Sequence, residues 1–239
     1  MLTCGCITAS AQDGFYIQPE FGLGKSVANI QHPYSIYFAA WGSGWTVPVK
    51  SVITFNPWVS AGYRYHNWNF TFGLSYTKSG FTEDSAWTSP GGAIGFTYKE
   101  TMYYYHIMVP VTAGYNFALG SHFYCNPAIG GEFVYNTSAR IIRGNYYPTI
   151  ETVEPDHTLT NSEFNNNYKR TGFWGLARVQ FGYKANDRLS IIAGPEVQTM
   201  FTSILKDNNN SQKSTNYTFS AGISWMLKHH KKAEDTPAK

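Results

Sequence analysis

Ionisable side chains are scarce in this chain of 239 residues, because Asp, Glu, Lys and Arg together make up only 14% of it. The first candidates for chemistry stand inside segments where polar and apolar residues alternate: Glu20, Arg64, His106, Glu132, Arg178 and Glu196. Acids and bases that line one path can conduct ions or relay protons. The same groups can instead satisfy one another and form an ionic plug that fills an interior.

The histidines suggest a second kind of chemistry, since a Ser, His and acid set near an outer rim would hydrolyse a membrane lipid. His32 and His157 lie in long connecting segments without an evident partner set, although Glu154, Asp156 and Ser162 are close to His157 in the sequence. The G-x-S-x-G motif of many hydrolases does not occur. We therefore expect no catalytic residues, and a lipid-modifying enzyme is the less favoured alternative.

Metal and nucleic-acid chemistry have little support. His229 and His230 are adjacent in the basic run "KHHKK" at 228–232, and a histidine pair is a small donor set for a metal. The formal net charge of +3 is too low to indicate a nucleic-acid partner. We expect no metal, no cofactor and no nucleic acid.

The segment "NWNFTFGLSYTK" at 67–78 indicates which elements position the ionisable residues. Its large apolar residues occupy every second position from Trp68 to Tyr76, and a period of two is typical of a β-strand with two unlike faces. Seven further segments repeat the pattern, and the apolar phase carries no charge in any of them. The eight expected strands are residues 15–23, 53–65, 68–76, 103–117, 123–135, 173–183, 189–201 and 217–227.

The opposite phase of these strands is small, polar and sparsely charged, and it contains the six ionisable residues. A soluble sandwich would carry many Lys and Glu on its water-facing side, whereas a narrow lumen requires small side chains. Strands that are apolar outside and polar inside are typical of a membrane barrel. Aromatic residues, 17% of the chain, gather at both ends of the apolar phase, as in the two interfacial girdles of membrane proteins.

The connections between the strands alternate in length. Short ones are expected at 66–67, 118–121 and 184–188, and long ones at 25–51, 78–102, 136–170 and 202–215. Short periplasmic turns and long extracellular loops are typical of outer-membrane barrels. The sequence therefore predicts an all-β fold, an eight-stranded antiparallel transmembrane up-and-down β-barrel in the cell outer membrane, with both termini on the periplasmic side.

An eight-stranded barrel has interior room only for side chains, so we interpret the ionisable residues as a plug rather than a channel. Counting from the short turns places Arg178 diagonally beside Glu196, and His106 opposite Glu132. Prolines inside strands each remove a ladder hydrogen bond, and we expect bulges or local breaks that shift the register beyond them. These prolines are Pro19, Pro57, Pro110, Pro127 and Pro195.

The ends of the chain differ from its centre. The leader "MLTCGCITASAQ" has a short apolar stretch followed by Ala9-Ser10-Ala11, an A-x-A pattern that predicts cleavage before Gln12. We interpret residues 1–11 as the remnant of a signal peptide that starts upstream, residues 12–227 as the barrel, and residues 228–239 as a basic periplasmic tail. A lipoprotein anchored through Cys6 is the alternative, although the preceding residues match a lipobox poorly.

The long connections are the candidate interaction surfaces. Aromatic residues in the first and third of them, Trp41, Trp45, Tyr146 and Tyr147, suit the binding of a protein or a glycan. The alternative is that strands extend beyond the membrane and end in solvated tips. We expect a monomer surrounded by outer-membrane lipid and lipopolysaccharide, with a protein or glycan partner at the extracellular loops.

Two neighbouring segments carry a family resemblance. "YYYHIMVPVTAGYNF" (103–117) and "FYCNPAIGGEFVY" (123–135) resemble consecutive strands of the PorT-like outer-membrane β-barrel family, with Val109-Pro110 for Ile-Pro and Asn126-Pro127 where Gly-Pro is usual. "GLARVQFGYKANDRLSII" (175–192) is similar to its Gly-rich hairpin, and "YTFSAGISWML" to its closing strand. The resemblance, over residues 14–227, implies the fold and the location. Because some relatives are associated with protein secretion, it also implies an accessory secretion role as an alternative to a structural or surface-interaction role.

Overall fold

The computed structural model describes residues 13–31, 49–88, 94–146, 151–153, 157–206 and 211–227, with side chains at 13–30, 49–83, 99–142, 157–206 and 211–227. The predicted leader at 1–11 and the predicted tail at 228–239 lie outside the described residues. No helix within these ranges is long and apolar enough to cross a membrane.

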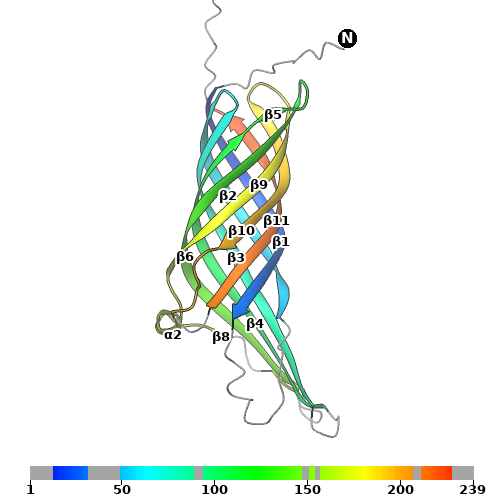
Figure 1. Cartoon of the computed structure of the whole chain (residues 1–239), viewed down its shortest axis with the longest axis vertical. Helices are drawn as coiled ribbons and strands as arrows, with labels where there is room; N and C mark the ends of the chain where they lie inside the picture. The colour runs from blue at the N-terminus through cyan, green and yellow to red at the C-terminus, as the bar shows by residue number, and fades with distance from the viewer. Residues whose placement is uncertain are drawn as a thin grey trace, which may run out of the picture.

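Eight long antiparallel strands of the described chain form a closed barrel, which confirms the predicted fold (Figure 1). The sheet order is β4-β3-β2-β1-β11-β10-β9-β6, and the pairing of β4 with β6 closes the barrel. The short strands β5, β7 and β8 also pair with β6. The elements are β1 Gly14–Gln31, β2 Val49–Tyr65, β3 Trp68–Thr88, β4 Ile94–Tyr115, β5 Phe117–Ala118, β6 Phe123–Tyr146, β7 Glu151–Val153, β8 His157–Thr158, α2 Asn161–Asn167, β9 Thr171–Lys184, β10 Leu189–Met200 and β11 Ser211–Met226.

The alternation in the sequence becomes the two faces of the barrel wall. On β3, Phe72 exposes 61% of its surface and Leu74 57%, whereas Thr71 and Ser75 each expose 3%. The other long strands repeat this pattern with apolar residues outside and polar residues inside. A continuous apolar wall of this kind is stable where lipid covers it, and barrel closure pairs the backbone groups that lipid cannot hydrogen-bond.

The short turns gather at one end of the barrel, together with the start of β1 and the end of β11. Gly14 pairs with Arg64 beside the 66–67 turn, and Tyr16 pairs with Met226. His66 adopts a positive φ of 53°, as tight hairpin turns require. The wall is consequently bounded by a compact rim at the short-turn end and by longer segments at the other, the asymmetry expected of an outer-membrane barrel.

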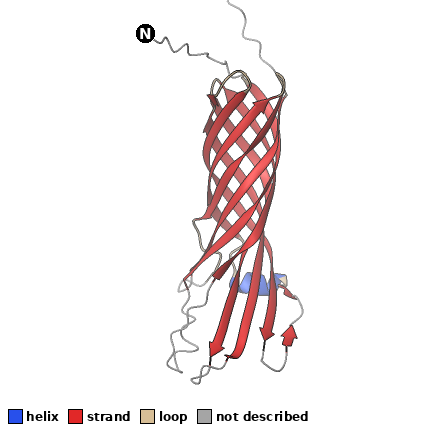
Figure 2. Cartoon of the chain, turned by 90° about the vertical axis from the view of Figure 1, so that its right-hand side faces the viewer, coloured by secondary structure: helices blue, strands red, loops and turns tan. Residues whose placement is uncertain are grey.

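The predicted extents of the long connections at 78–102 and 136–170 are wrong. β3 continues to Thr88, β4 begins at Ile94 and β6 reaches Tyr146, so these three strands project beyond the barrel as a sheet (Figure 2). The reason is that the hairpin ladder continues past the apolar wall, with Lys78 opposite Tyr105 and Trp87 opposite Phe96. These segments therefore match the alternative given for the long connections, in which strands extend beyond the membrane.

The five prolines disturb the ladder less than predicted. Pairs are missing on one side of Pro19, Pro110, Pro127 and Pro195, yet the register is the same before and after each gap. A one-residue shift occurs in β2 between Ser51 and Trp58, next to Pro57. Each proline lacks the backbone N–H that would bond to one neighbouring strand. The strand on its other side remains paired, and this pairing maintains the register across the gap.

Candidate functional site

Glu20 on β1 lies inside the barrel and accepts hydrogen bonds from three side chains. Arg178 Nη1 on β9 lies 3.0 Å from Glu20 Oε1, and both side chains are 1% exposed. Gln18 Nε2 donates to the same oxygen at 2.7 Å, and Gln180 Nε2 donates to Oε2. Because β11 and β10 separate β1 from β9 in the sheet, this Glu20 cluster spans the lumen.

The predicted pairing of Arg178 with Glu196 is wrong. The two residues are direct cross-strand neighbours rather than diagonal ones, and the ion pair of Arg178 is made with Glu20. Glu196 Oε1 instead accepts from Asn56 Nδ2 at 2.9 Å, and Thr77 Oγ1 donates to Asn56 Oδ1 at 2.9 Å. Counting residues along the strands identifies neighbours on adjacent strands. It cannot show that an arginine prefers a partner on the opposite side of the lumen.

The predicted opposition of His106 and Glu132 is also wrong. Asn136 is the register partner of His106, and Pro110 is that of Glu132. The error comes from the hairpin turn, which was expected at 118–121. The strand continues through Ala118 and the chain turns after it, so every partner on β6 is displaced along the strand.

His106 and Glu132 have separate polar partners. The Nε2 of His106 lies 2.6 Å from Ser79 Oγ, and its Nδ1 lies 2.6 Å from Asn136 Oδ1. Glu132 Oε1 accepts from Gln198 Nε2 at 2.9 Å. Each group is fully buried and held by neutral side chains. The arrangement is a set of local clusters rather than one continuous chain of charges.

Arg64 lies at the short-turn end of the lumen between two tyrosine rings. Its guanidinium carbon is 5.6 Å from the ring centre of Tyr16 and 5.7 Å from that of Tyr124. Gly62 and Gly182 make room for these rings, because a Cβ at either position would overlap them. All six predicted network residues therefore lie inside the barrel, but among these six only Glu20 and Arg178 form an ion pair with each other.

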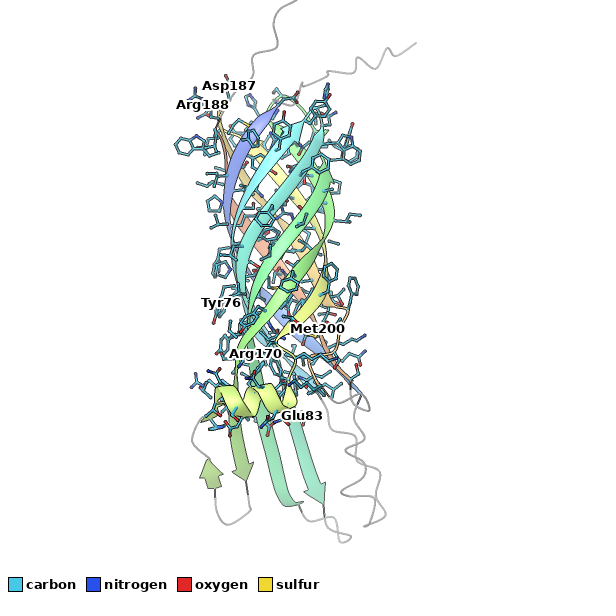
Figure 3. The ribbon with its side chains drawn as sticks, turned by 90° about the vertical axis from the view of Figure 1, so that its left-hand side faces the viewer. Tyr76, Glu83, Arg170, Asp187, Arg188 and Met200 are labelled. Carbon is cyan, nitrogen blue, oxygen red and sulfur yellow. The ribbon has the colours of Figure 1, made fainter. Side chains whose placement is uncertain are left out.

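A buried apolar cluster closes the loop end of the barrel, and the sequence analysis did not predict it. This cluster, here called the apolar cap, joins barrel strands to α2 and to the segment after β10, and Phe164 of α2 is 1% exposed within it. Figure 3 shows α2 lying across this end, close to Met200 and Arg170. The cap comprises Phe81, Met102, Tyr104, Met108, Val134, Ala139, Ile141, Phe164, Tyr168, Trp174, Met200 and Ile204.

Local sequence explains why the cap contains a helix. Thr160 Oγ1 accepts from the Glu163 N–H, and Glu163 Oε2 accepts from the Thr160 N–H at 2.8 Å, which together form a capping box. The Thr160 N–H and the Thr160 hydroxyl, which donates to the same Oε2 at 2.9 Å, hold the pKa of the Glu163 carboxyl below its ordinary value. Phe164 and Tyr168 follow at a spacing of four, so both reach the same side. The T-x-x-E pattern before this pair was the missed signal.

The enzyme alternative gains no catalytic set from the described residues. His157 Nε2 lies 3.2 Å from Glu163 Oε2, and both side chains are exposed. No serine is hydrogen-bonded to His157 among the residues described, and Ser162 is exposed on α2. His32, Glu154 and Asp156 lie outside them. Among the described residues, no group of three His, Cys, Asp or Glu side chains could hold a metal.

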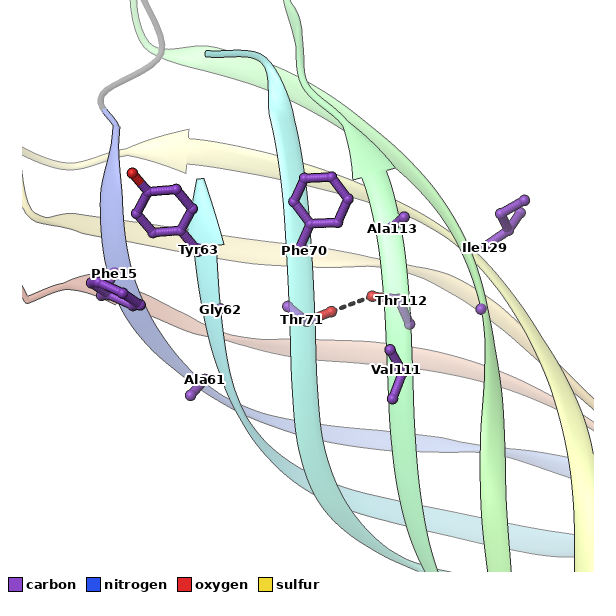
Figure 4. A pocket seen from close by; sticks show the side chains of 11 residues that line it. Phe15, Ala61, Gly62, Tyr63, Phe70, Thr71, Val111, Thr112, Ala113 and Ile129 are labelled. Atoms are coloured by element: carbon purple, nitrogen blue, oxygen red, sulfur yellow. Dashed lines mark hydrogen bonds between the residues drawn. The ribbon is translucent and has the colours of Figure 1, made fainter. Parts of the chain in front are cut away.

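Two hollows on the outer surface of the barrel are exposed to lipid. One groove of about 470 Å³ is lined by outward residues such as Phe15, Tyr63 and Phe70 around the small Ala61 and Ala113 (Figure 4). A second groove of about 480 Å³ continues from Ala113 along the outer face. Both hollows lie on the apolar side of the wall, so they fit acyl chains and not a polar substrate.

The predicted surface-binding residues are not placed by the structure. Trp41, Trp45 and Tyr147 lie outside the described residues, and so does the side chain of Tyr146. The backbone of Tyr146 ends β6, where it pairs with Thr97 and Glu151. Their role in binding therefore stays a prediction.

The closed wall, its apolar outer face and its end-to-end asymmetry make this chain an outer-membrane β-barrel protein. These features come from the residues themselves. Charged residues lie at both ends of the apolar outer wall, with Asp187 and Arg188 at the short turns and Glu83 beyond the other end (Figure 3).

No protein-family model and no curated protein matches the chain. Among solved structures, it is similar to Neisserial surface protein A, with 16% identity and a TM-score of 0.44 over 91% of this chain and 99% of that one. The outer-membrane protein OprG from Pseudomonas aeruginosa is 8% identical, with a TM-score of 0.38 over 93% of this chain and 99% of that one. The N-terminal β-barrel domain of OprF from Pseudomonas aeruginosa is 10% identical, with a TM-score of 0.39 over 90% of this chain and 98% of that one. At these values the likeness says nothing about function.

Proposed function

We propose that this protein is a monomeric outer-membrane barrel with a structural or surface-interaction role, whose lumen is filled by a polar and ionic plug. The observation that carries the proposal is the ion pair between Glu20 and Arg178, which joins β1 to β9 across the lumen with both side chains 1% exposed. An eight-stranded barrel holds little more than side chains, so this pair and its glutamine partners leave no wide path for solutes.

The apolar cap supports the same proposal independently. It covers the loop end with large side chains, among them Trp174, Tyr104 and Phe81, each at most 2% exposed. An ion entering from that end would lose its hydration before it reached any of the buried carboxylates. The plug is polar and the cap is apolar, so a solute would have to displace two barriers of opposite chemistry.

A narrow ion channel is the second candidate, and one observation favours it. Glu132 Oε2, Glu196 Oε2 and Arg178 Nε are buried and make no hydrogen bond to another described residue. Buried polar atoms without partners are costly, and water reaching them would relieve that cost. Such hydration would support slow passage of protons or small ions, but it does not require an open path.

The extended sheet of β3, β4 and β6 is the surface that we propose for a protein or glycan partner, because it projects beyond the lipid-covered wall. Outer-membrane lipid and lipopolysaccharide would surround the wall itself. The resemblance to the PorT-like family supports an accessory role in protein secretion as the alternative. A lipid-modifying enzyme is less favoured, since Glu163 pairs with His157 and no serine does in the described chain.

Planar-bilayer recording tests the plug. The wild type should insert without steady conductance, and so should Phe164→Ala, which opens only the cap, and Glu20→Ala/Arg178→Ala, which removes only the ion pair. Combining the three substitutions should produce conductance. Stable, ion-selective conductance in the wild type would instead establish the channel.

A pull-down after cross-linking in cells tests the partner. Recovery of secretion components would favour the accessory role. Recovery of surface proteins or glycans, which variants with a shortened β3–β4 hairpin lose, would favour the surface-interaction role.

A further inference from the structure

The outward face of the wall changes character at the loop end. On β3 the outward series Phe72, Leu74 and Tyr76 is followed by Lys78, and on β1 Leu23 is followed by Lys25. Tyr76 projects from the wall at this level (Figure 3). These lysines stand at the first outward positions beyond the charge-free belt, at the depth where lipid head groups begin.

Lys78 is held on aromatic rings. Its Nζ lies 4.6 Å from the ring centre of Tyr103 on β4 and 5.3 Å from that of Phe55 on β2. The rings of Tyr76 and Tyr105 stack beside it, with centres 6.2 Å apart and an angle of 16° between their planes. Side chains from three strands thus fix an ammonium group that a flexible lysine would otherwise leave mobile.

No carboxylate of the described residues lies within ion-pair distance of Lys78 or Lys25. Lys78 is only partly exposed, so its charge is partly withdrawn from water without a paired anion among the described residues. A lysine at a membrane edge extends its head group towards the interface, where an anionic lipid can neutralise it.

The strand register places further cations beside this group. Lys25 is opposite Ile53 on β2, the strand that contributes Phe55, and Arg140 on β6 is opposite Tyr103. The rings under Lys78 therefore lie between an outward lysine on one side and an arginine on the other. A ligand with a phosphate and a neighbouring sugar would find a cation and an aromatic surface together.

We propose that Lys78, Tyr103 and Phe55 form a binding site for a phosphorylated glycolipid of the outer leaflet. The Lys78 ammonium binds the phosphate, the adjacent rings contact the sugar, and the acyl chains lie along the apolar wall below Tyr76. The site rests on the proposed outer-membrane barrel and on the orientation predicted from the sequence, in which the long connections face the extracellular side.

Native mass spectrometry of the full chain in detergent tests the site, with bisphosphorylated lipid A and dephosphorylated lipid A as probes. The wild type should retain the bisphosphorylated form preferentially. Lys78→Gln should weaken that retention by about fivefold or more, as expected from losing one basic group beside an anionic lipid. Lys213→Gln is the matched control, because Lys213 is a lysine at the same end of the barrel that has no ring contact among the described residues. It should bind like the wild type.

Equal retention of both lipids, or equal losses in the two lysine variants, would overturn the site. Displacement of lipid A by the same concentration of inorganic phosphate would reduce it to a general anion site and would also overturn it. Since Lys78→Gln can act through stability, Tyr103→Leu serves as a second variant. It keeps the charge and should still lower retention. Binding in detergent is independent of conductance, so failure here leaves the plug proposal standing, and conductance of the wild type leaves this site standing.

Discussion

Replacing Glu20 by Gln, Arg178 by Met, and both together measures how much the ion pair across the lumen stabilises the barrel. Arg178 Nη1 and Glu20 Oε1 are 3.0 Å apart and almost completely buried. At an effective dielectric constant of about 20, unit charges at this distance attract by about 5–6 kcal/mol, part of which offsets their desolvation. Each single substitution strands the other charge and should lower the free energy of unfolding by about 3–5 kcal/mol.

The double substitution should cost clearly less than the two single ones together, with a coupling energy of about 2–3 kcal/mol. The matched control is the same cycle between Arg178 and Glu196. These residues are direct neighbours in the register but form no ion pair, and Glu196 has Asn56 as its partner. Because these two residues share no ion pair or hydrogen bond, their coupling should be clearly smaller than that between Glu20 and Arg178.

Urea unfolding of the barrel folded in lipid vesicles, followed by tryptophan fluorescence, gives these free energies, and an unchanged dependence on urea shows that the variants unfold alike. Additive losses for Glu20 and Arg178, combined with strong coupling between Arg178 and Glu196, would refute the reasoning. That result would mean that the arginine side chain points along the wall rather than across the lumen.

Three further outcomes are expected. Phe72→Arg, which places a charge on the lipid face, should cost about 2–4 kcal/mol in refolding experiments, whereas Leu119→Arg in an exposed turn should cost less than about 1 kcal/mol. Phe164→Ala should destabilise the cap by about 3–5 kcal/mol and expose residues 157–170 to protease, while the barrel stays folded. The pKa of Glu163 is lowered from its ordinary 4.5, so its capping of α2 is complete above that pH and is lost as the pH falls through the lower folded value. After correction for the pH dependence of the intrinsic exchange rate, the hydrogen-exchange protection of α2 should therefore decrease on acidification below pH 4.5, and Glu163→Gln should remove that decrease.

The sequence predicted the wall of this barrel because the relevant signal is local. A period of two sorts residues into faces without any knowledge of register, and Phe72 and Ser75 were assigned to their correct faces in this way. The same argument placed Glu20, Arg64 and Arg178 inside before their partners were known. Face is a property of a single strand, and it survives errors in the position of a turn.

The partners of the lumen residues were not predictable in the same way. Moving the hairpin turn past Ala118 was enough to replace Glu132 by Asn136 as the partner of His106. The contact from Arg178 to Glu20 depends on the curvature of the whole barrel, since β10 and β11 lie between their strands. The cap needs the segment around Tyr168 to meet Leu205 from another connection. Tertiary closure determines these contacts, and no single segment encodes them.

The cap and the plug are adjacent, and this adjacency sets the polarity of the barrel interior. Glu132 is opposite Trp174, a cap residue, so the apolar seal lies directly beside a buried carboxylate. Exclusion of water there strengthens the hydrogen bond from Gln198 to Glu132 but increases the cost of the carboxylate oxygen that has no partner in the described chain. Loosening the cap therefore loses apolar packing while it hydrates that oxygen, so the two effects oppose each other. In the Glu20 cluster both carboxylate oxygens of Glu20 accept hydrogen bonds, whereas Arg178 Nε and Nη2 have no partner among the described residues and water would hydrate them. It follows that water entering from the loop end would relieve the carboxylate of Glu132, and in the Glu20 cluster only the guanidinium of Arg178, while the carboxylate of Glu20 already has its partners.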